Sequence, residues 1–177
     1  MTGAVAKRYA RALFSLAVEE GRFDAAGEEL ARAAEAFRND ELAALARSAA
    51  VDPRTKREVV AQLAARLGIA PLVGRFLGLI AEKNRLAELA AIEEQYRRLV
   101  DRRLGRVRAR IRSATALPAE GEREIREVFE KKTGKKVLAE VSVAPELIGG
   151  VAVEIEGRVY DGTLRTQLEA MKAALSG

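Results

Sequence analysis

The sequence predicts a mostly α-helical protein in two parts, an N-terminal six-helix bundle over residues 1–104 and a small α/β module over residues 105–177. Two observations support this fold class. The residues of the first part are rich in Ala, Leu, Glu and Arg, which favour helices, and contain almost no runs of β-branched residues. After Gly105, apolar and polar residues alternate with a period of two, which indicates half-buried strands.

Breaks in the helical pattern divide the first part into six helices. The breaks fall at Gly21, at Asn39, at Asp52 and between Gly68 and Pro71. Asp52 is a suitable helix cap, because the proline that follows it fits the first helical position, where no N–H donor is needed. The predicted helices cover residues 3–20, 23–38, 40–48, 53–67, 71–83 and 85–104, and the short loops between them favour a compact bundle.

The second part is predicted to combine strands with two helices. Apolar residues alternate with arginines over residues 106–112, and residues 137–143 and 151–155 show the same period of two. Pro118 opens a helix that ends at Gly134, and a short strand is expected at 159–160. A last helix is expected to carry one apolar stripe formed by Leu164, Leu168, Met171 and Leu175.

Composition excludes several kinds of chemistry. The 177 residues contain no cysteine and no histidine, so disulfides and thiolate metal sites are excluded and the commonest general base is missing. The net charge of +5 suits a nucleic acid, an acidic partner or an anionic membrane surface, and does not choose between them. No apolar run approaches the roughly 20 residues that span a bilayer. We expect a soluble cytoplasmic protein of bacterial type, whose first residues form a helix of the fold rather than a targeting segment.

The sequence also lacks the patterns of a nucleotide site or a catalytic centre. Gly134 is followed by two lysines, but Phe129 stands where a phosphate-binding loop has its first glycine, and no hydroxyl residue follows. Gly149 and Gly150 lead into a strand rather than a helix, so they indicate a tight turn. Neighbouring glutamates on a helix do not face each other and cannot act as an acid–base pair. We therefore expect no catalytic residues, no cofactor and no metal, and a function in binding.

Two predicted helices are more apolar than a surface helix needs to be. Apolar residues cover an arc of about 200° on the first helix, whereas packing against one core needs little more than about 100°. The helix at 71–83 has almost no polar side, and Gly74 and Gly78 lie four residues apart on one face. Either both helices are central to the bundle, or each keeps a second apolar face for a partner helix.

A bundle of this size has room for about one fully central helix, so two such helices predict a groove between them. The candidate residues of this partner-binding groove are Tyr9, Leu13, Phe14, Phe76, Leu77, Gly78 and Ile80. The sequence does not separate the members of this set that face a partner from those that belong to the core.

Three stretches of the chain match, in order and spacing, those of a known family. They are VAKRYARALF at residues 5–14, the run from Phe76 through NRL at 84–86 to Tyr96, and LIGGV at 147–151 followed by DGTL at 161–164. Together they resemble the delta subunit of bacterial F-type ATP synthase, called the oligomycin-sensitivity-conferring protein in mitochondria. Two departures are small: Ala144 replaces an acid before Pro145, and Thr163 replaces a serine.

The resemblance implies a non-catalytic stator subunit that couples proton translocation to ATP synthesis by holding the catalytic head to the peripheral stalk. It implies that the first and fifth helices bind the N-terminal helix of an alpha subunit, and that the C-terminal module binds the C-terminal ends of the b subunits. It also implies one copy per complex and a monomer in isolation. Membrane association, at the cytoplasmic face of the bacterial cell membrane, would occur only through the complex.

The alternative function is that of a basic nucleic-acid-binding protein. Arginines run from Arg97 to Arg112 and could contact phosphates. Aromatic residues make up only 5% of the chain, however, and none alternates with these arginines to form a stacking platform. We therefore expect no nucleic acid among the partners.

Overall fold

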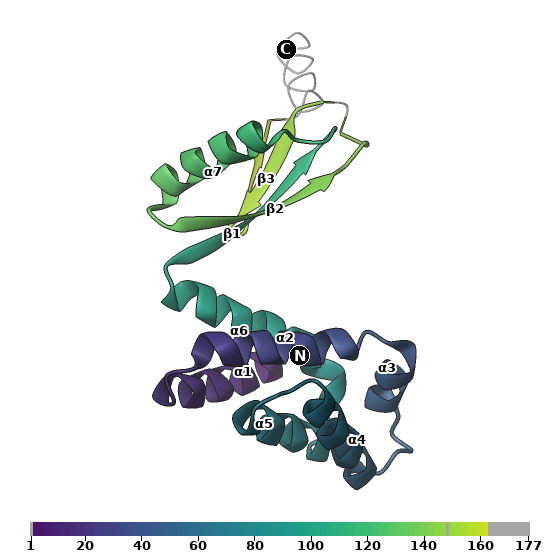
Figure 1. Cartoon of the computed structure of the whole chain (residues 1–177). Coiled ribbons are helices and arrows are strands. Elements are labelled where there is room, and N and C mark those ends of the chain that lie inside the picture. Colours follow the sequence, from purple (N-terminus) through teal and green to yellow (C-terminus); the bar gives the residue numbers. More distant parts are fainter. Residues whose placement is uncertain (1, 148, 163–177) are drawn as a thin grey trace. The chain divides into compact units, whose positions relative to one another are not determined.

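The computed structural model describes residues 2–147 and 149–162 (Figure 1). Within them the protein is mostly helical, with a small four-stranded sheet in its C-terminal part, as the sequence predicts. The chain forms two compact units, Met1–Val100 and Asp101–Gly177. The boundary between these units falls inside the helix Leu89–Arg103, a few residues before the end of the first predicted part.

The helices of the N-terminal part follow the predicted ranges within a few residues. They are α1 (Thr2–Glu19), α2 (Phe23–Ala36), α3 (Asp40–Arg47), α4 (Pro53–Arg66), α5 (Pro71–Glu82), the short 3-10 helix η1 (Leu86–Glu88) and α6 (Leu89–Arg103). The segment expected as one helix over 85–104 thus begins with a 3-10 turn. Asn84 adopts a left-handed conformation with φ of 55° just before it, which ends α5 and redirects the chain.

Local side-chain caps explain where two of these helices begin. The side chain of Asn39 accepts hydrogen bonds from the backbone N–H groups of Glu41 and Leu42, at 3.0 and 3.4 Å. The side chain of Asp52 accepts one from the N–H of Arg54 at 3.0 Å, so the predicted cap is confirmed. Each cap satisfies a donor that the first turn of a helix leaves without a partner.

The core of the helical unit is built on one stripe of α1. Ala6, Ala10, Leu13 and Ala17 are all fully buried, and they recur every three or four residues. The small alanines allow neighbouring helices to approach α1 closely. The rest of the core comes from apolar residues of the other helices, among them Leu30, Ala33, Val60, Val73, Leu77, Ile80, Ile92 and Tyr96.

One charged residue lies inside this unit. Lys56 of α4 is 0% exposed. Its ammonium group donates hydrogen bonds to the carbonyl of Ala46 at 3.3 Å, the carbonyl of Ser48 at 2.7 Å and Oδ1 of Asn84 at 2.5 Å. Three acceptors match the three donors of the ammonium group, which compensates for its removal from water.

Tyr96 of α6 is a second buried polar residue. Its hydroxyl donates a hydrogen bond to the carbonyl oxygen of Phe23 at 2.8 Å, which joins α6 to the start of α2. Burial raises the pKa of Tyr96 above its usual value, and the nearby carboxylates of Asp24 and Glu29 raise this pKa further. The phenol therefore stays protonated and keeps its role as a donor.

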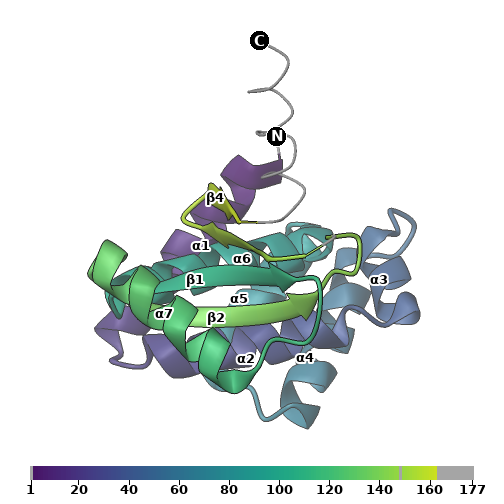
Figure 2. The same cartoon turned by 90° about the horizontal axis from the view of Figure 1, so that it is seen from above.

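The C-terminal unit contains a mixed sheet. Its elements are β1 (Arg106–Ser113), α7 (Ala119–Thr133), β2 (Lys136–Val143), β3 (Val151–Ile155) and β4 (Arg158–Asp161), and the strand order is β2-β1-β3-β4. β1 pairs with β2 in parallel and with β3 antiparallel, as Figure 2 shows for β1 and β2 lying side by side. The predicted strands and the helix after Pro118 are confirmed. The predicted C-terminal helix lies outside the described residues.

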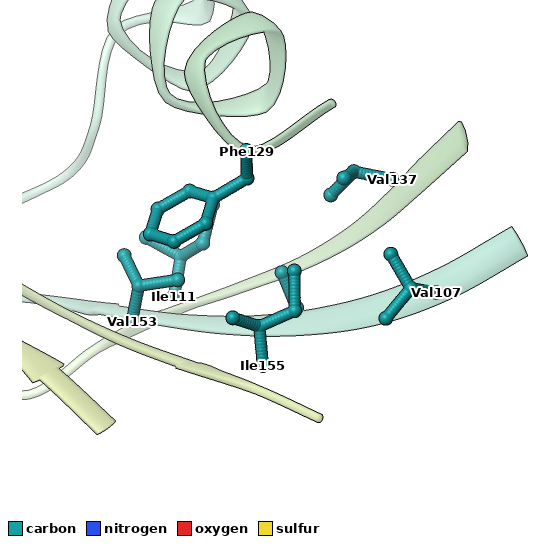
Figure 3. Close-up of a cluster of buried hydrophobic side chains, with 7 residues drawn as sticks. Val107, Ile111, Phe129, Val137, Val153 and Ile155 are labelled. Atoms are coloured by element: carbon teal, nitrogen blue, oxygen red, sulfur yellow. The ribbon is translucent and has the colours of Figure 1, made fainter. Parts of the chain in front are cut away.

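The core of this unit lies between α7 and one face of the sheet. Phe129 of α7 points toward Ile111 of β1 and Val153 of β3 (Figure 3). Its ring also meets Tyr160 edge-to-face, at 5.2 Å between centroids. Apolar residues at alternate positions of each strand face α7, which is the arrangement that the period of two predicts.

Candidate functional site

A hydrophobic groove lies between α1 and α5, which pack side by side (Figure 1). Its volume is about 540 Å³. We call it the α1–α5 groove. It is lined by Arg8, Tyr9, Ala12, Leu13 and Leu16 of α1, by Glu20 directly after α1, and by Leu72, Arg75, Phe76 and Leu79 of α5.

The groove exists because α1 is apolar on two adjacent stripes. One stripe, built on Ala6 and Leu13, is buried in the core. The second, formed by Tyr9, Ala12 and Leu16, follows the same helical spacing but lines the groove. Leu16 is 49% exposed, so this second stripe leaves apolar surface open to solvent.

The side of α5 that meets the groove has a similar division. Leu72 and Phe76 are buried, whereas Leu79 is 44% exposed. The rings of Tyr9 and Phe76 meet edge-to-face, with centroids 6.3 Å apart, and join the two helices within the groove. The packed rings of Tyr9 and Phe76 thus hold the two helices together, and Leu16 and Leu79 add exposed apolar surface beside them.

Three charged side chains border the groove, namely Arg8, Arg75 and Glu20. All three are exposed. The guanidinium carbon of Arg8 lies 5.6 Å from the centroid of the Tyr9 ring, a cation–π distance. Within residues 2–147 and 149–162, none of the three forms an ion pair or a side-chain hydrogen bond, although many other charged residues of the chain do.

The structure brings together three of the seven predicted groove residues. Tyr9, Leu13 and Phe76 line the α1–α5 groove. Leu77 and Ile80 are buried in the core.

Phe14 lies elsewhere on α1. Its ring contacts the rings of Phe23 and Tyr96, at 6.0 and 5.6 Å between centroids. Phe14 thus packs toward α2 and α6, away from the lining of the α1–α5 groove.

Gly78 belongs to a different surface. It lines a second groove, between α4 and α5, together with Arg57, Ala61 and Gly74. A Cβ atom added at Gly78 would lie 3.9 Å from Cγ of Arg57 of α4, an ordinary van der Waals distance. Leu79 and Arg75 border both grooves, so they form the ridge between them.

Sequence reasoning missed seven of the groove residues, although it contained a signal for most of them. Ala12 and Leu16 share the helical stripe of Tyr9, and Leu72 and Leu79 belong to the apolar helix 71–83. The missing information was which of two apolar stripes is buried, and that depends on contacts with α2 and α6. The bordering charges, Arg8, Glu20 and Arg75, carried no signal of their own.

The arginine run that motivated the nucleic-acid alternative is largely ion-paired. Arg108 donates to Asp101 at 2.6 Å and to Glu140 at 3.2 Å. Arg110 pairs with Glu154 at 3.5 Å, and the other pairs of the run are Arg97–Glu93, Arg98–Glu94 and Arg112–Glu146. Paired arginines offer less positive field to a phosphate backbone, so the sheet does not form the basic stripe that the alternative requires.

The described part of the chain contains neither a cluster of metal-ligating side chains nor a membrane-spanning helix. No group of three or more acidic residues there is arranged to hold a metal ion. Among the helices of that part, none has the length and hydropathy needed to cross a membrane.

The described residues define a protein of two units, a helical unit with an apolar groove and a small α/β unit, and such a groove is a surface on which an amphipathic helix can pack. Comparisons with known proteins identify the family. The family model described as ATP synthase delta (OSCP) subunit matches residues 5–175. The chain belongs to the ATP synthase delta (OSCP) subunit family.

Individual relatives agree with this assignment. The chain is 39% identical over 176 residues to the ATP synthase subunit delta of Anaeromyxobacter dehalogenans, covering 99% of this chain and 98% of the relative. It is 39% identical over 175 residues to that of Citrifermentans bemidjiense, covering 98% and 97%. It matches a chain in the cryo-EM structure of the Toxoplasma gondii mitochondrial ATP synthase hexamer with a TM-score of 0.75 and 20% identity, covering 97% of both chains. This last likeness shows a shared fold.

Proposed function

We propose that this chain is a non-catalytic stator subunit of a rotary F-type ATP synthase, and that it links the catalytic head to the peripheral stalk. The observation that carries the proposal is the α1–α5 groove, which lies on the two helices that are too apolar for a surface position. Its length along α1, from Arg8 to Glu20, is about three helical turns and suits one amphipathic helix.

The proposed occupant of the groove is the N-terminal helix of an alpha subunit. In this arrangement α1 to α6 form a six-helix bundle at the top of the head, and residues 105–177 bind the C-terminal ends of the b subunits. The chain then acts as a single copy that is monomeric in isolation. It reaches the cytoplasmic face of the bacterial membrane only as part of the complex.

A non-catalytic role is supported by the chemistry of the described residues. They include exposed apolar surface but no cluster of metal-ligating side chains, and the chain contains no histidine. The proposed task is mechanical, because a stator must hold the head against the torque of the rotor so that proton flow is coupled to ATP synthesis.

The test is to measure the affinity of the full-length chain for a synthetic peptide with the sequence of the alpha-subunit N-terminal helix. Leu16→Asp and Leu79→Asp place a charge on the two most exposed apolar side chains of the groove. Each is expected to weaken binding by about 30-fold or more, as for loss of about 2 kcal/mol at an interface hot spot. Both side chains are already exposed, so the melting temperature should change little.

Val128→Asp is the matched control, because Val128 is an exposed apolar residue of α7, which contributes nothing to the groove. It should leave the affinity for the peptide unchanged. Absence of saturable binding by the unmodified chain would refute the proposed site, as would equal effects of all three substitutions.

A further inference from the structure

We infer that two buried charged residues, Glu29 of α2 and Lys56 of α4, are positioning residues that fix α5 along its axis, one at each end of the helix. Neither lines the α1–α5 groove, yet together they hold the helix that forms one of its sides. This inference rests on the proposed function and deepens it, because it names residues outside the groove on which partner binding depends.

α5 has few features of its own that would hold it in place. Its first turn contains no acidic residue, its last turn contains no basic residue, and Ala70 at its N-cap has no side chain that could accept a hydrogen bond. Most of the helix is apolar, and apolar contacts specify a position along the axis less sharply than directional hydrogen bonds do. The ion pair of Glu82 with Arg57 is exposed on both sides, so water screens it.

Glu29 supplies a contact at the N-terminal end of α5. The residue is only 6% exposed, and its Oε2 accepts a hydrogen bond from the backbone N–H of Ala70 at 3.1 Å. In a capping box, a glutamate in the first turn of the same helix accepts from this N–H. Val73 holds that position in α5, and the carboxylate comes from α2 instead. The negative charge also lies at the positive end of the α5 dipole.

The second oxygen of Glu29 connects the same carboxylate to the end of α1. Oε1 accepts a hydrogen bond from the guanidinium group of Arg22 at 2.5 Å. Arg22 closes α1, because its N–H donates to the carbonyl of Ala17 at 2.9 Å after the left-handed Gly21. One carboxylate thus joins the last turn of α1 to the start of α5, which sets the level of one helix against the other.

Lys56 makes the corresponding contact at the C-terminal end of α5. Asn84 has a left-handed φ of 55°, and its N–H donates to the carbonyl of Ala81 at 2.9 Å, which closes the helix. The buried ammonium group of Lys56 donates to Oδ1 of Asn84 at 2.5 Å and to two backbone carbonyls at the end of α3. A positive charge therefore lies at the negative end of the α5 dipole.

The burial of both charges indicates a role in position rather than in stability. Hydrogen bonds offset the free-energy cost of removing charged groups from water only in part, so apolar side chains in the same places often give an equally stable core. The best-attested use of buried charged groups is to fix the register of packed elements. Here two charges of opposite sign, from two neighbouring helices, match the two ends of one helix.

The experiment uses the full-length chain and the alpha-subunit N-terminal peptide. Asn84→Gly removes the acceptor that Lys56 meets at the end of α5, and glycine readily keeps the left-handed conformation. Glu29→Leu removes the acceptor at the other end. Each substitution should weaken peptide binding by about three- to tenfold, within the range for residues that act on a site indirectly.

A conservative variant and a matched control separate position from stability. Asn84→Asp keeps an oxygen acceptor for Lys56 and tolerates the left-handed conformation, so it should bind within about twofold of the unmodified chain. Asn39→Gly removes the same side chain from the cap of α3 and should also bind within about twofold. A loss in either of them as large as in Asn84→Gly would overturn the inference.

Spin labels measure the position of α5 directly. The chain contains no cysteine, so Ala31→Cys on α2 and Arg75→Cys on α5, both at exposed positions, can be labelled selectively. In double electron–electron resonance, Asn84→Gly and Glu29→Leu should shift or broaden the distance between the labels by at least about 1.5 Å, the rise of one residue along a helix. A general loss of stability leaves the distance in the folded chain unchanged.

The two measurements together decide the inference. Unchanged label distances in both variants would overturn it, as would shifted distances with unchanged affinity. Asn84 is exposed, so Asn84→Gly carries the test alone if circular dichroism shows that Glu29→Leu does not fold. If the unmodified chain does not bind the peptide, the proposed function fails, while the label distances still test whether the two charges fix α5.

Discussion

Lys56 carries a charged group into the interior of the helical unit, where three oxygen atoms accept hydrogen bonds from its ammonium group. Two of these acceptors are the backbone carbonyls of Ala46 and Ser48 at the end of α3, and the third is the side chain of Asn84 after α5. One side chain of α4 thus joins the end of α3 to the loop after α5. No local pattern around Lys56 distinguishes it from the exposed basic residues nearby, so its place in the core could not be predicted from the sequence.

Tyr96 gives a prediction for alkaline pH. The hydroxyl is buried and donates to the carbonyl of Phe23, so the folded state favours the protonated phenol and raises its pKa. In the unfolded state the pKa is near 10. The stabilisation from Tyr96 is therefore complete below about pH 10 and is lost as the pH rises from there toward the higher pKa of the folded state.

The measurement compares the unmodified chain with Tyr96→Phe by urea unfolding between neutral pH and about pH 11. At neutral pH the variant should be less stable by about 1–2 kcal/mol, because the carbonyl of Phe23 loses its donor. Above about pH 10 the difference in the free energy of unfolding should shrink. The phenol of Tyr96 ionises in the unfolded state of the unmodified chain, which lowers the stability of that chain, whereas the phenylalanine of the variant does not titrate. Titration of other groups occurs in both chains and cancels. A difference that stays constant with pH would show that Tyr96 titrates as it does in the unfolded state.

At the scale of the element, α5 contains two glycines whose conformation needs no glycine. Neither Gly74 nor Gly78 has a positive φ, and added Cβ atoms would meet nothing within 4 Å at Gly74 and only Arg57, at 3.9 Å, at Gly78. Gly74→Ala and Gly78→Ala should each raise the free energy of unfolding by about 0.5–1 kcal/mol, because alanine is the better helix former.

The control for these substitutions is Gly134→Ala at the end of α7. Gly134 has φ of 67°, in the left-handed region that favours glycine, so alanine there should destabilise the protein by about 1–2 kcal/mol. Urea unfolding measures all three. If the two α5 variants are less stable than the unmodified chain, packing at the α4–α5 surface needs the space that these glycines leave, and the prediction is wrong.

Features that depend on interactions between neighbouring residues could be predicted from the sequence, whereas features that depend on contacts between distant segments could not. The start of α4 at Pro53 and the end of α7 at Gly134 depend on neighbouring residues, and both were predicted. The strand order β2-β1-β3-β4 depends on pairing between distant segments, and the alternating pattern contains no information about it.

The α1–α5 groove depends on both kinds of interaction, so it was predicted only in part. An excess of apolar residues identified α1 and α5, because periodicity is a local property of each helix. The side of each helix that faces outward depends on its neighbours. Phe14 and Tyr9 are both aromatic residues of α1, yet Phe14 packs on Tyr96 of α6, while Tyr9 lines the groove with Phe76. A helical wheel shows that both residues belong to the apolar side of α1, but it does not show which of them lines the groove.

At the scale of the whole molecule, we predict that a fragment of residues 1–104 folds alone. The compact unit Met1–Val100 has its own core, and the fragment also includes the end of α6 at Arg103. Far-UV circular dichroism should show a helical monomer that unfolds cooperatively on heating. A fragment that stays unfolded, or that is helical but melts without a cooperative transition, would contradict a boundary near Leu104.

We also predict that the isolated chain neither hydrolyses ATP nor binds it at micromolar concentration. The sequence lacks a phosphate-binding loop, since Phe129 takes the place of its first glycine, and in the structure Phe129 is a core residue of α7. Isothermal titration calorimetry with MgATP should show no saturable heat. A micromolar dissociation constant would contradict the proposed division of labour between this subunit and the catalytic head.

The connection between α6 and β1 has a mechanical consequence. Only Leu104 and Gly105 separate Arg103, the end of α6, from Arg106, the start of β1. Two residues extend by about 7 Å at most, so this connection can lengthen very little. A force applied along the chain is therefore transmitted directly to β1. β1 is hydrogen-bonded to strands on both sides, β2 and β3. Tension directed along β1 would load these bonds together in shear instead of opening them one by one, and strands loaded in this way resist extension strongly, as a part that holds against torque must do.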